Sequence, residues 1–554
     1  MNKHRIHILI VLSLTLLAAC GQAPIPTSDA TPTPPPPPTV AKRTVAPAVT
    51  RAAAVSGSSQ TVAQLPEGGA IAIGAIGNAD LDVNTLVPFL QSALYDSLLR
   101  PNPETGALEP GLAESYQVSS DAATITFKLR QGVHWHNGDP LTAADVAATI
   151  NALANPDLRD TPVTDLSYFK KATAPDDRTV VVSLSEGYCP ALTSIGTLKI
   201  LPRAVAESSN FPVLQANQLI GTGPLKLVSA SQNLYLFEPN RDYYLGVPHI
   251  GSWTLKLYSD ANAMRAAFDA KQIDLMVLEP REASALKGIQ EATVLKTASP
   301  EPVMLLFNLE SVALNDLRVR QAVSFALDRG TLLKDIGGQG EALDTSALPN
   351  YWALPKGLAS PSFDVARAKQ LLGEAGWNAG GDGSLSKGGR PLTLELWTEA
   401  DDPVLEPLAF GIREMIAALG INVQMELDDQ PGWITRAFSH RFDLLLITRK
   451  LPLDPDQHWY WQSDQNAPGS GFNFGSYSNT RVDASFKASM QANGCNSTTR
   501  ANLFGDVSRQ LNADAAAAFL LTPSRFMVAR DRVLGLDPSS FAGDFWNMAD
   551  WRVK

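Results

Sequence analysis

The side chains best able to bind a charged ligand are concentrated in one stretch, Thr448 to Asp456, which follows a predicted strand. Arg449 and Lys450 could bind a carboxylate, sulfate or phosphate group, the arginine through two parallel hydrogen bonds. The carboxylates that could instead bind an ammonium group are Asp454, Asp456 and, upstream, Glu399. The alternative for Arg449 and Lys450 is a solvated basic pair at an edge of the fold.

Three tryptophans are candidates for stacking against a ligand, because aromatic walls are common in pockets that bind small solutes. They are Trp397, Trp459 and Trp461. Each of them could equally belong to the hydrophobic core. Trp397 is the best placed of the three, because it lies at the end of a predicted strand.

The sequence predicts no metal site, no phosphate-binding loop and no catalytic site. His134 and His136 lie two apart on a predicted strand with Asp139 near them, which a transition metal could use, but an ordinary polar strand-to-turn segment explains the pattern better. The turn Gly221 to Pro224 lacks the Gly-Lys-Ser/Thr continuation of a phosphate-binding loop, and a tight turn is favoured. No histidine neighbours a G-x-S-x-G nucleophile motif, and we expect neither an enzyme nor a cofactor.

The beginning of the chain has the pattern of a secretion signal. Residues 1–19 combine a basic start with an apolar run that is too short to span a membrane, and they end at Leu17-Ala18-Ala19 before Cys20. This order resembles the site of bacterial lipoprotein processing, with Cys20 as the lipidated residue; an ordinary signal peptide is the alternative. We expect a mature protein outside the cytoplasm that contacts the membrane only through its lipid anchor, on the periplasmic or extracellular face.

Residues 20–66 are rich in Pro, Thr and Ala and contain no aromatic residue, which predicts a disordered tether. The rest of the chain exceeds what one hydrophobic core usually serves, so two or more lobes are expected. The net charge of -11 argues against a nucleic-acid partner. If Cys20 is lipidated, Cys189 and Cys495 remain, either as a disulfide or as two unpaired cysteines.

Hydrophobic periodicity predicts an α/β fold with mixed sheets. Strands are expected near residues 70–73, 124–129, 179–184, 225–228 and 253–258, and helices at 142–153, 315–329 and 363–375. The clearest stretch is a β-α-β-α-β unit with strands 392–397, 422–427 and 442–448 and helices 404–419 and 433–438, which predicts a parallel sheet. Ligands of such sheets lie beyond the carboxyl ends of the strands.

Six motifs in order resemble the dipeptide, oligopeptide and nickel-binding family of ABC-transporter solute-binding proteins. They are LEPGLAESYQVSSDAATITFKLRQGVHWHNGDPLTAADV (108–146), GTGPLKL (221–227), NRDYYLG (240–246), FNLESVALNDLRVRQAVSFALDR (307–329), FDVARAKQLLGEAGW (363–377) and NFGSYSNTRVDASF (473–486). The resemblance implies a periplasmic-binding-protein-like fold with two lobes, a hinge and a ligand in the cleft. It places lobe I at 67–299 with an extra subdomain, lobe II at 300–521, a return to lobe I at 522–554, and hinge crossings near Pro300 and Leu521.

The resemblance also implies a function: a monomer that captures a peptide or another small solute and delivers it to the permease and ATPase subunits of an importer. One residue departs from the pattern. In peptide-binding relatives an aspartate four positions before the proline that corresponds to Pro455 pairs with the ammonium group of the peptide, and here that position is Leu451. A changed mode of ligand binding is expected, because a buried ammonium without a partner is costly. The alternatives are a binder of a non-peptide solute, a surface sensor with the same fold and a secreted hydrolase.

Overall fold

The computed structural model describes residues 68–554 apart from 79–80, 84, 156–165, 167, 355–356 and 359–360. The predicted signal peptide (1–19), the predicted lipidation site Cys20 and the predicted tether (20–66) lie outside the described residues.

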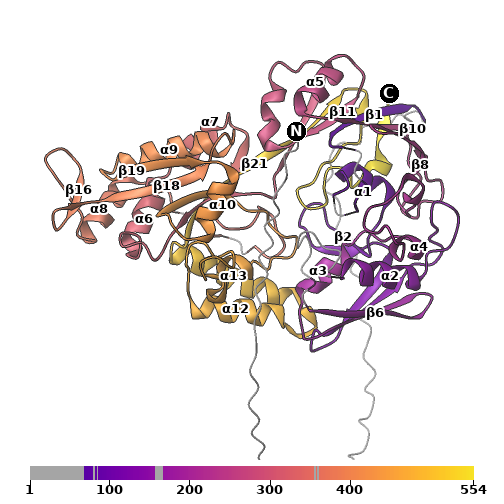
Figure 1. Cartoon of the computed structure of the whole chain (residues 1–554), viewed down its shortest axis with the longest axis horizontal. Helices are drawn as coiled ribbons and strands as arrows, with labels where there is room; N and C mark the ends of the chain where they lie inside the picture. Colours follow the sequence, from indigo (N-terminus) through magenta and orange to yellow (C-terminus); the bar gives the residue numbers. More distant parts are fainter. Residues whose placement is uncertain are drawn as a thin grey trace, which may run out of the picture. The chain divides into compact units, whose positions relative to one another are not determined.

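One long strand, β21 (Ala517–Arg530), connects the two halves of the fold (Figure 1). Its first part pairs with β13 (Val303–Phe307), and its last part pairs with β11 (Leu275–Leu278) and β12 (Ala292–Ala298). Through β21 a 12-stranded sheet runs in the order β19-β18-β20-β13-β21-β11-β1-β10-β9-β8, with β12 and β14 pairing with β21 beside this path. We call residues 68–299 and 522–554 lobe I and residues 300–521 lobe II.

Lobe I combines one half of this sheet with a four-stranded antiparallel subdomain. The sheet strands are β1 (Ala70–Ile76), β8 (Leu225–Ala230), β9 (Leu234–Pro239) and β10 (Ser252–Tyr258), with helices α1 (Pro88–Leu94) and α5 (Ala261–Asp269). The subdomain contains β4 (Ala113–Val118), β5 (Thr124–Leu129), β6 (Phe169–Asp176), β7 (Thr179–Leu184), α2 (Ala143–Leu153), α3 (Pro190–Gly196) and α4 (Arg203–Ala206). Short pairs are β2 (Leu99–Pro101) with β3 (Leu108–Pro110) and β22 (Val533–Leu534) with β23 (Arg552–Val553).

Lobe II carries helices on both faces of its half of the sheet. Its strands are β13, β14 (Gly340–Ala342), β18 (Thr393–Glu399), β19 (Asn422–Asp428) and β20 (Leu444–Thr448), and a small sheet contains β15 (Asn378–Ala379), β16 (Leu385–Lys387) and β17 (Arg390–Pro391). Its helices are α6 (Leu317–Ala326), α7 (Arg329–Asp335), α8 (Val365–Glu374), α9 (Leu405–Ala417), α10 (Gln430–Phe438), α11 (His458–Trp461), α12 (Thr480–Met490) and α13 (Ser497–Ala513).

The side chains of β13 show why both faces of this half-sheet are covered. Val303, Leu305 and Phe307 point into the core that contains α6, α8 and α9. Met304 and Leu306 alternate with them and join the core on the other face, which includes residues of α12 and α13. All five side chains are buried, as expected for a strand with helices on both sides.

The predicted β-α-β-α-β unit is confirmed as β18-α9-β19-α10-β20, whose strands are parallel to one another. The predicted helix 315–329 is wrong in extent, because it is divided into α6 and α7. Leu327 has an extended conformation, and the Asp328 side chain accepts a hydrogen bond from the Gly330 amide and begins the second helix. His134 and His136 do not lie on a strand as predicted; the chain there forms an isolated bridge from His134 to Pro140 followed by a turn.

Strand β21 changes its pairing partners close to Leu521, one of the two positions predicted as crossings between the lobes. Leu521 pairs with β13 and β14, whereas Ser524 pairs with Ala298 of β12. The amide of Leu451 donates to the Pro300 carbonyl at 2.8 Å, so the chain segment after β20 borders the same crossing.

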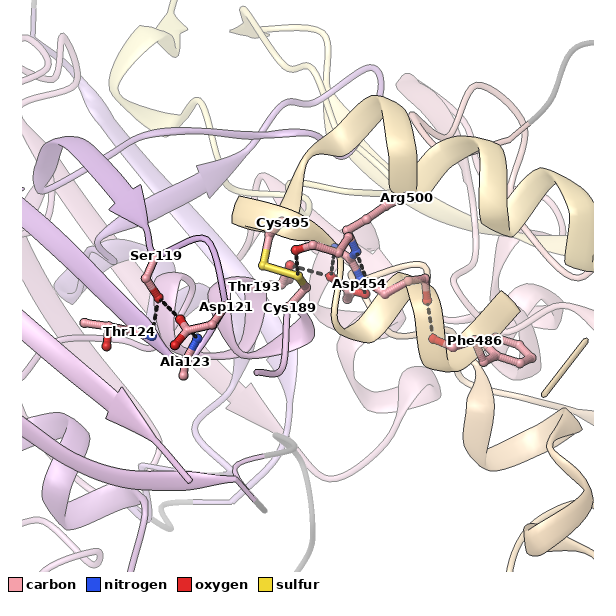
Figure 2. The surroundings of a disulfide bond; sticks show 12 residues. Ser119, Asp121, Ala123, Thr124, Cys189, Thr193, Asp454, Phe486, Cys495 and Arg500 are labelled. Atoms are coloured by element: carbon pink, nitrogen blue, oxygen red, sulfur yellow. Dashed lines mark hydrogen bonds and ion pairs between the residues drawn. A yellow bond between two sulfur atoms is a disulfide. The ribbon is translucent and has the colours of Figure 1, made fainter. Parts of the chain in front are cut away.

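A disulfide joins Cys189 to Cys495, with Cα atoms 5.3 Å apart (Figure 2). The sequence leaves open a disulfide and two unpaired thiols, and the structure has the disulfide. Cys189 directly precedes α3 in lobe I, and Cys495 lies between α12 and α13 in lobe II. The separation of 306 residues makes this pairing a tertiary feature that local sequence does not predict.

Candidate functional site: a cavity between the lobes

A cavity of about 1060 Å³ lies where lobe I meets lobe II. Lobe I contributes residues 103–105, 296–298 of β12 and 538–541, and lobe II contributes most residues from 341 to 358. Ligand pockets for small molecules commonly measure roughly 300–1,000 Å³. The cavity is therefore large enough for a peptide or another sizeable solute.

An aromatic segment of lobe II forms one wall of this cavity and contacts lobe I. The ring of Tyr351 stacks on Phe541, with centroids 5.5 Å apart. The amide of Trp352 donates to the Thr105 carbonyl at 2.9 Å, and the Tyr351 hydroxyl donates to the carbonyl of Leu453. The contacts with Phe541 and Thr105 hold the two lobes together at the wall of the cavity, and the contact with Leu453 fixes Tyr351 within lobe II.

The charged side chains that line the cavity are mostly acidic. Among the described residues they are the carboxylates of Glu104, Glu341 and Asp344 and the ammonium group of Lys296. Because carboxylates outnumber cations among these described side chains, their electrostatic field favours a cationic group on the ligand.

The six residues predicted to bind the ligand do not line this cavity. They are Trp397, Glu399, Arg449, Lys450, Asp454 and Trp459. Trp397 is buried in lobe II, where the guanidinium carbon of Arg436 lies 3.6 Å from its ring centroid. Glu399 accepts a hydrogen bond from Arg281 of lobe I at 3.3 Å.

Arg449 is a buried residue of lobe II. Its guanidinium group donates to the Phe472 carbonyl at 2.9 Å and lies over the rings of Tyr460, Trp461 and Phe474, with the nearest centroid at 4.4 Å. Burial lowers the pKa of Arg449 to about 10. Lys450, the next residue, is exposed, so the two predicted cations point into different environments.

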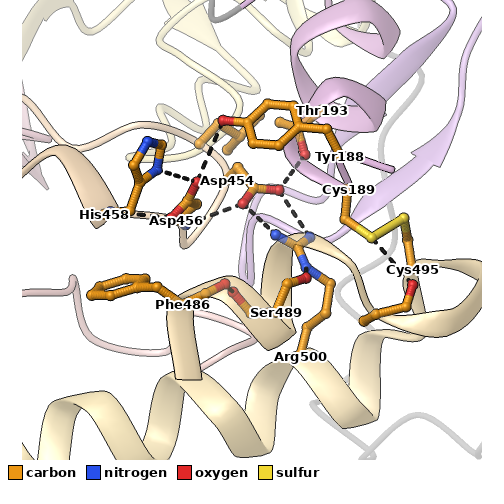
Figure 3. Close-up of polar contacts among 12 residues, drawn as sticks. Tyr188, Cys189, Thr193, Asp454, Asp456, His458, Phe486, Ser489, Cys495 and Arg500 are labelled. Carbon is orange, nitrogen blue, oxygen red and sulfur yellow. Dashed lines mark hydrogen bonds and ion pairs between the residues drawn. A yellow bond between two sulfur atoms is a disulfide. The ribbon is translucent and has the colours of Figure 1, made fainter. Parts of the chain in front are cut away.

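Asp454 is at the centre of a buried hydrogen-bond network (Figure 3). Its two carboxylate oxygens accept hydrogen bonds from the Arg500 guanidinium at 2.6 and 3.0 Å, and one of them also accepts from the Thr193 hydroxyl at 2.9 Å. Burial alone lowers the pKa of Arg500, but the charge of Asp454 and its hydrogen bonds raise it overall. The carboxylate of Asp454 already has charged and neutral partners from both lobes.

Asp456 and the nearby tryptophans also have partners within the protein. The Asp456 carboxylate lies 2.7 Å from Nδ1 of His458 and accepts a hydrogen bond from the Tyr188 hydroxyl at 3.5 Å. Trp461 is buried edge-on to Phe519, whereas Trp459 is 37% exposed and packs on the His458 ring. Of the three predicted tryptophans, Trp459 is therefore the one whose side chain is exposed to solvent.

The sequence alone does not indicate the aromatic wall or the partners of Asp454. The Asn350-Tyr351-Trp352 run in a proline-containing segment is a weak local signal of a binding loop. Thr193 and Arg500 offer no local signal, because each is an ordinary polar residue of a helix until the tertiary structure places it beside Asp454.

His136 has partners that explain its position without a metal. Its Nδ1 accepts a hydrogen bond from the Gly221 amide at 3.2 Å, and its Nε2 lies 3.0 Å from the Gly223 carbonyl. These contacts assign the neutral tautomer with the proton on Nε2. Burial lowers the pKa of His136 to about 4.

Stability should fall on acidification because of His136. The unfolded state takes up the proton near pH 6.5, whereas the folded state resists protonation until about pH 4, so the stabilisation is present above pH 6.5 and is lost as the pH falls. The total change is about 3 kcal/mol. Urea unfolding of the wild-type protein and His136→Gln between these pH values measures the difference. Equal pH dependence in both proteins would exclude this role.

In the part of the chain that the structure describes, no group of three or more His, Cys, Asp or Glu side chains is arranged to hold a metal ion. Among the same residues, no helix has the length and apolar character needed to cross a membrane.

Two lobes joined by crossing strands, with a solute-sized cavity between them, define the class of two-lobed periplasmic binding proteins. Within this class, residues 107–470 match the model of the bacterial extracellular solute-binding proteins, family 5 (middle region). The match covers well over half of the chain, which therefore belongs to this family.

Relatives across this family resemble the chain over most of its length. The oligopeptide-binding protein AppA of Bacillus subtilis (strain 168) is 26% identical over 518 residues, which cover 90% of this chain and 94% of the relative. The nickel-binding periplasmic protein of Escherichia coli (strain K12) is 28% identical over 382 residues, 66% of this chain and 72% of the relative.

Solved structures support the same fold. The structure of AppA from Bacillus subtilis with a nonapeptide has a TM-score of 0.64 and 23% identity, and it covers 89% of this chain and 100% of that chain. The structure of NikA from Brucella suis with Fe(III)-EDTA has a TM-score of 0.73 and 24% identity, and it covers 88% of this chain and 100% of that chain.

Proposed function

We propose that this chain captures a peptide or peptide-like solute in the cavity between its lobes and delivers it to the permease of an ABC-type importer. The observation that carries the proposal is the 1060 Å³ cavity with an aromatic wall, in a chain of the solute-binding family. The name of the Bacillus subtilis relative, an oligopeptide-binding protein, supports the ligand class. Binding and release are the whole activity, without chemical conversion of the solute.

The acidic lining suggests how a peptide ammonium group is held although Leu451 replaces the usual aspartate. Glu104, Glu341 and Asp344 line the cavity, and each could supply the negative charge that Leu451 does not. We favour these carboxylates over Asp454 and Arg449, because Asp454 is paired with Arg500 and Arg449 is buried in lobe II.

We further propose where the protein is located and how it is anchored. A monomer is anchored outside the cytoplasm through a lipid on Cys20, after removal of residues 1–19, and residues 20–66 separate the anchor from two lobes with crossings near Pro300 and Leu521. The family description, extracellular solute-binding proteins, supports this location. Membrane sedimentation tests the anchor, because a Cys20→Ser chain that still sediments with membranes and yields no soluble protein contradicts it.

Thermal unfolding against a panel of solutes tests the ligand class. The panel contains di- to nonapeptides, N-acetylated peptides of the same sequences, sugars, phosphorylated solutes and nickel. A solute present at 100 times its dissociation constant should stabilise the protein by about 2.7 kcal/mol. We expect stabilisation by free peptides and a weaker response to acetylated ones, because acetylation removes the ammonium charge.

Two tryptophan variants locate the binding site. Trp352 lines the cavity and Trp459 does not, although each side chain is partly exposed. Trp352→Ala should abolish most of the ligand-induced shift in Tm, and Trp459→Ala should keep it. The opposite result would mean that the ligand binds at the surface around Trp459. If only nickel or sugars stabilise the protein, the ligand is a non-peptide solute.

A further inference from the structure

The Cys189–Cys495 disulfide joins the lobes at a second place, away from the strands that connect them. In Figure 1, β21 links the two halves of the sheet, and α3 meets the α12–α13 pair at a different edge of the fold. Cys189 directly precedes α3, and Cys495 lies in the turn between α12 and α13. The lobes are therefore connected covalently through the main chain and again through this bond.

Noncovalent contacts surround the disulfide and cross between the same two lobes. The Cys189 amide donates to the Met490 carbonyl of α12 at 2.7 Å. The Thr193 hydroxyl of α3 donates to Asp454 at 2.9 Å, and Figure 3 shows this contact beside the Asp454–Arg500 pair. The side chains of Cys189, Asp454 and Arg500 are buried, so this edge is a packed interface and not a loose surface contact.

Each cysteine is held rigidly in its own lobe. Ile195 of α3 is fully buried in the core of the lobe I subdomain. Phe486 of α12 and Phe504 of α13 are buried in the same lobe II core as Trp397 and Phe519. A rotation of one lobe against the other about the strands that connect them therefore moves Cys189 away from Cys495, unless the turn at residues 491–496 rearranges.

We propose that the Cys189–Cys495 disulfide restrains the opening of the cleft, so that the oxidised protein exchanges solute through small movements of the lobes. The restraint follows from geometry, because a disulfide tolerates Cα separations of up to about 7 Å and the two Cα atoms here are 5.3 Å apart. Wide rotation about the crossing strands, which would separate this edge most, requires that the bond be broken. The inference rests on the two-lobed fold and not on the identity of the solute.

Hydrogen exchange of the whole chain, in wild-type form and as Cys189→Ser/Cys495→Ser, tests the restraint without any ligand. The reporter is the Trp352 amide, which donates to Thr105 across the lobes at a site distinct from the disulfide. Reference amides lie within one lobe, in the β18–β19 pair of lobe II and the β5–β7 pair of lobe I. In the double variant the Trp352 amide should exchange at least about tenfold faster, while the reference amides are unchanged.

Two outcomes would overturn the proposal. Unchanged exchange at Trp352 would mean that the disulfide does not limit opening. An equal acceleration of Trp352 and the reference amides would mean that the bond only stabilises the fold against global unfolding, as the closure of a long loop does. If the double variant does not fold, the same comparison is made on wild-type protein before and after reduction by a dithiol, which leaves both side chains in place as thiols.

Discussion

Replacement of Arg500 by methionine is expected to lower the free energy of unfolding by about 3–5 kcal/mol, because it leaves the Asp454 carboxylate buried without its cation. Both oxygens of Asp454 accept hydrogen bonds from Arg500, and the two side chains are only 7% and 5% exposed. The Thr193 hydroxyl and the Asp456 amide still donate to Asp454, but neither carries the positive charge that a buried carboxylate needs. Chemical denaturation at neutral pH measures the loss.

Two further variants make this prediction specific. Arg500→Met combined with Asp454→Leu should recover most of the stability, because two apolar groups replace the pair. Arg481→Met is the matched control: this arginine is 68% exposed and lies 4.0 Å from Asp506, so a loss below about 1 kcal/mol is expected. Similar losses for both arginines would refute the argument.

Gly221→Ala is expected to destabilise the protein by more than about 3 kcal/mol or to prevent folding. A Cβ at this position would lie 1.7 Å from the Leu94 carbonyl oxygen and 2.9 Å from the Tyr95 ring. The obstructing atom belongs to the backbone at the end of α1, which cannot move as a flexible side chain would. The same glycine exchanges hydrogen bonds with His136 through its amide and its carbonyl, so a shift would also break these contacts.

Gly373→Ala is the control for the glycine substitution. Gly373 lies in α8 with no atom within 4 Å of an added Cβ, so the change should stabilise the helix by up to about 1 kcal/mol. Urea unfolding compares the two variants. A loss of less than about 1 kcal/mol for Gly221→Ala would show that the turn can shift to accept a side chain.

Local elements were predictable because their signals are local. Thr142 and Asp145 predict the beginning of α2, and both hydrogen bonds from Thr142 to the Asp145 carboxylate are present at 2.9 and 2.7 Å. Asp364 begins α8, and Gly376 follows it with φ +88°. The β18–β20 unit shows the alternation of strands and helices that periodicity predicts.

The site was less predictable, because it depends on which distant segments meet. The sequence places Arg449 and Asp454 after a strand of a parallel sheet, where ligands often bind, but it does not indicate which side chains point inward. Arg449 lies among the aromatic residues of lobe II, and Asp454 meets Arg500 from α13. The cavity instead lies beside Tyr351 and Trp352, in a segment without a periodic pattern.

The sequence by itself determined the class of fold, the resemblance to a solute-binding family and most secondary structure, because hydrophobic periodicity, capping residues and ordered motifs act over short distances along the chain. Only the tertiary structure decided that Cys189 pairs with Cys495, that Asp454 binds Arg500 and Thr193, and that the cavity is lined by carboxylates from both lobes. These features join residues up to 306 positions apart, and the packing of the two lobes, not local preference, brings them within bonding distance.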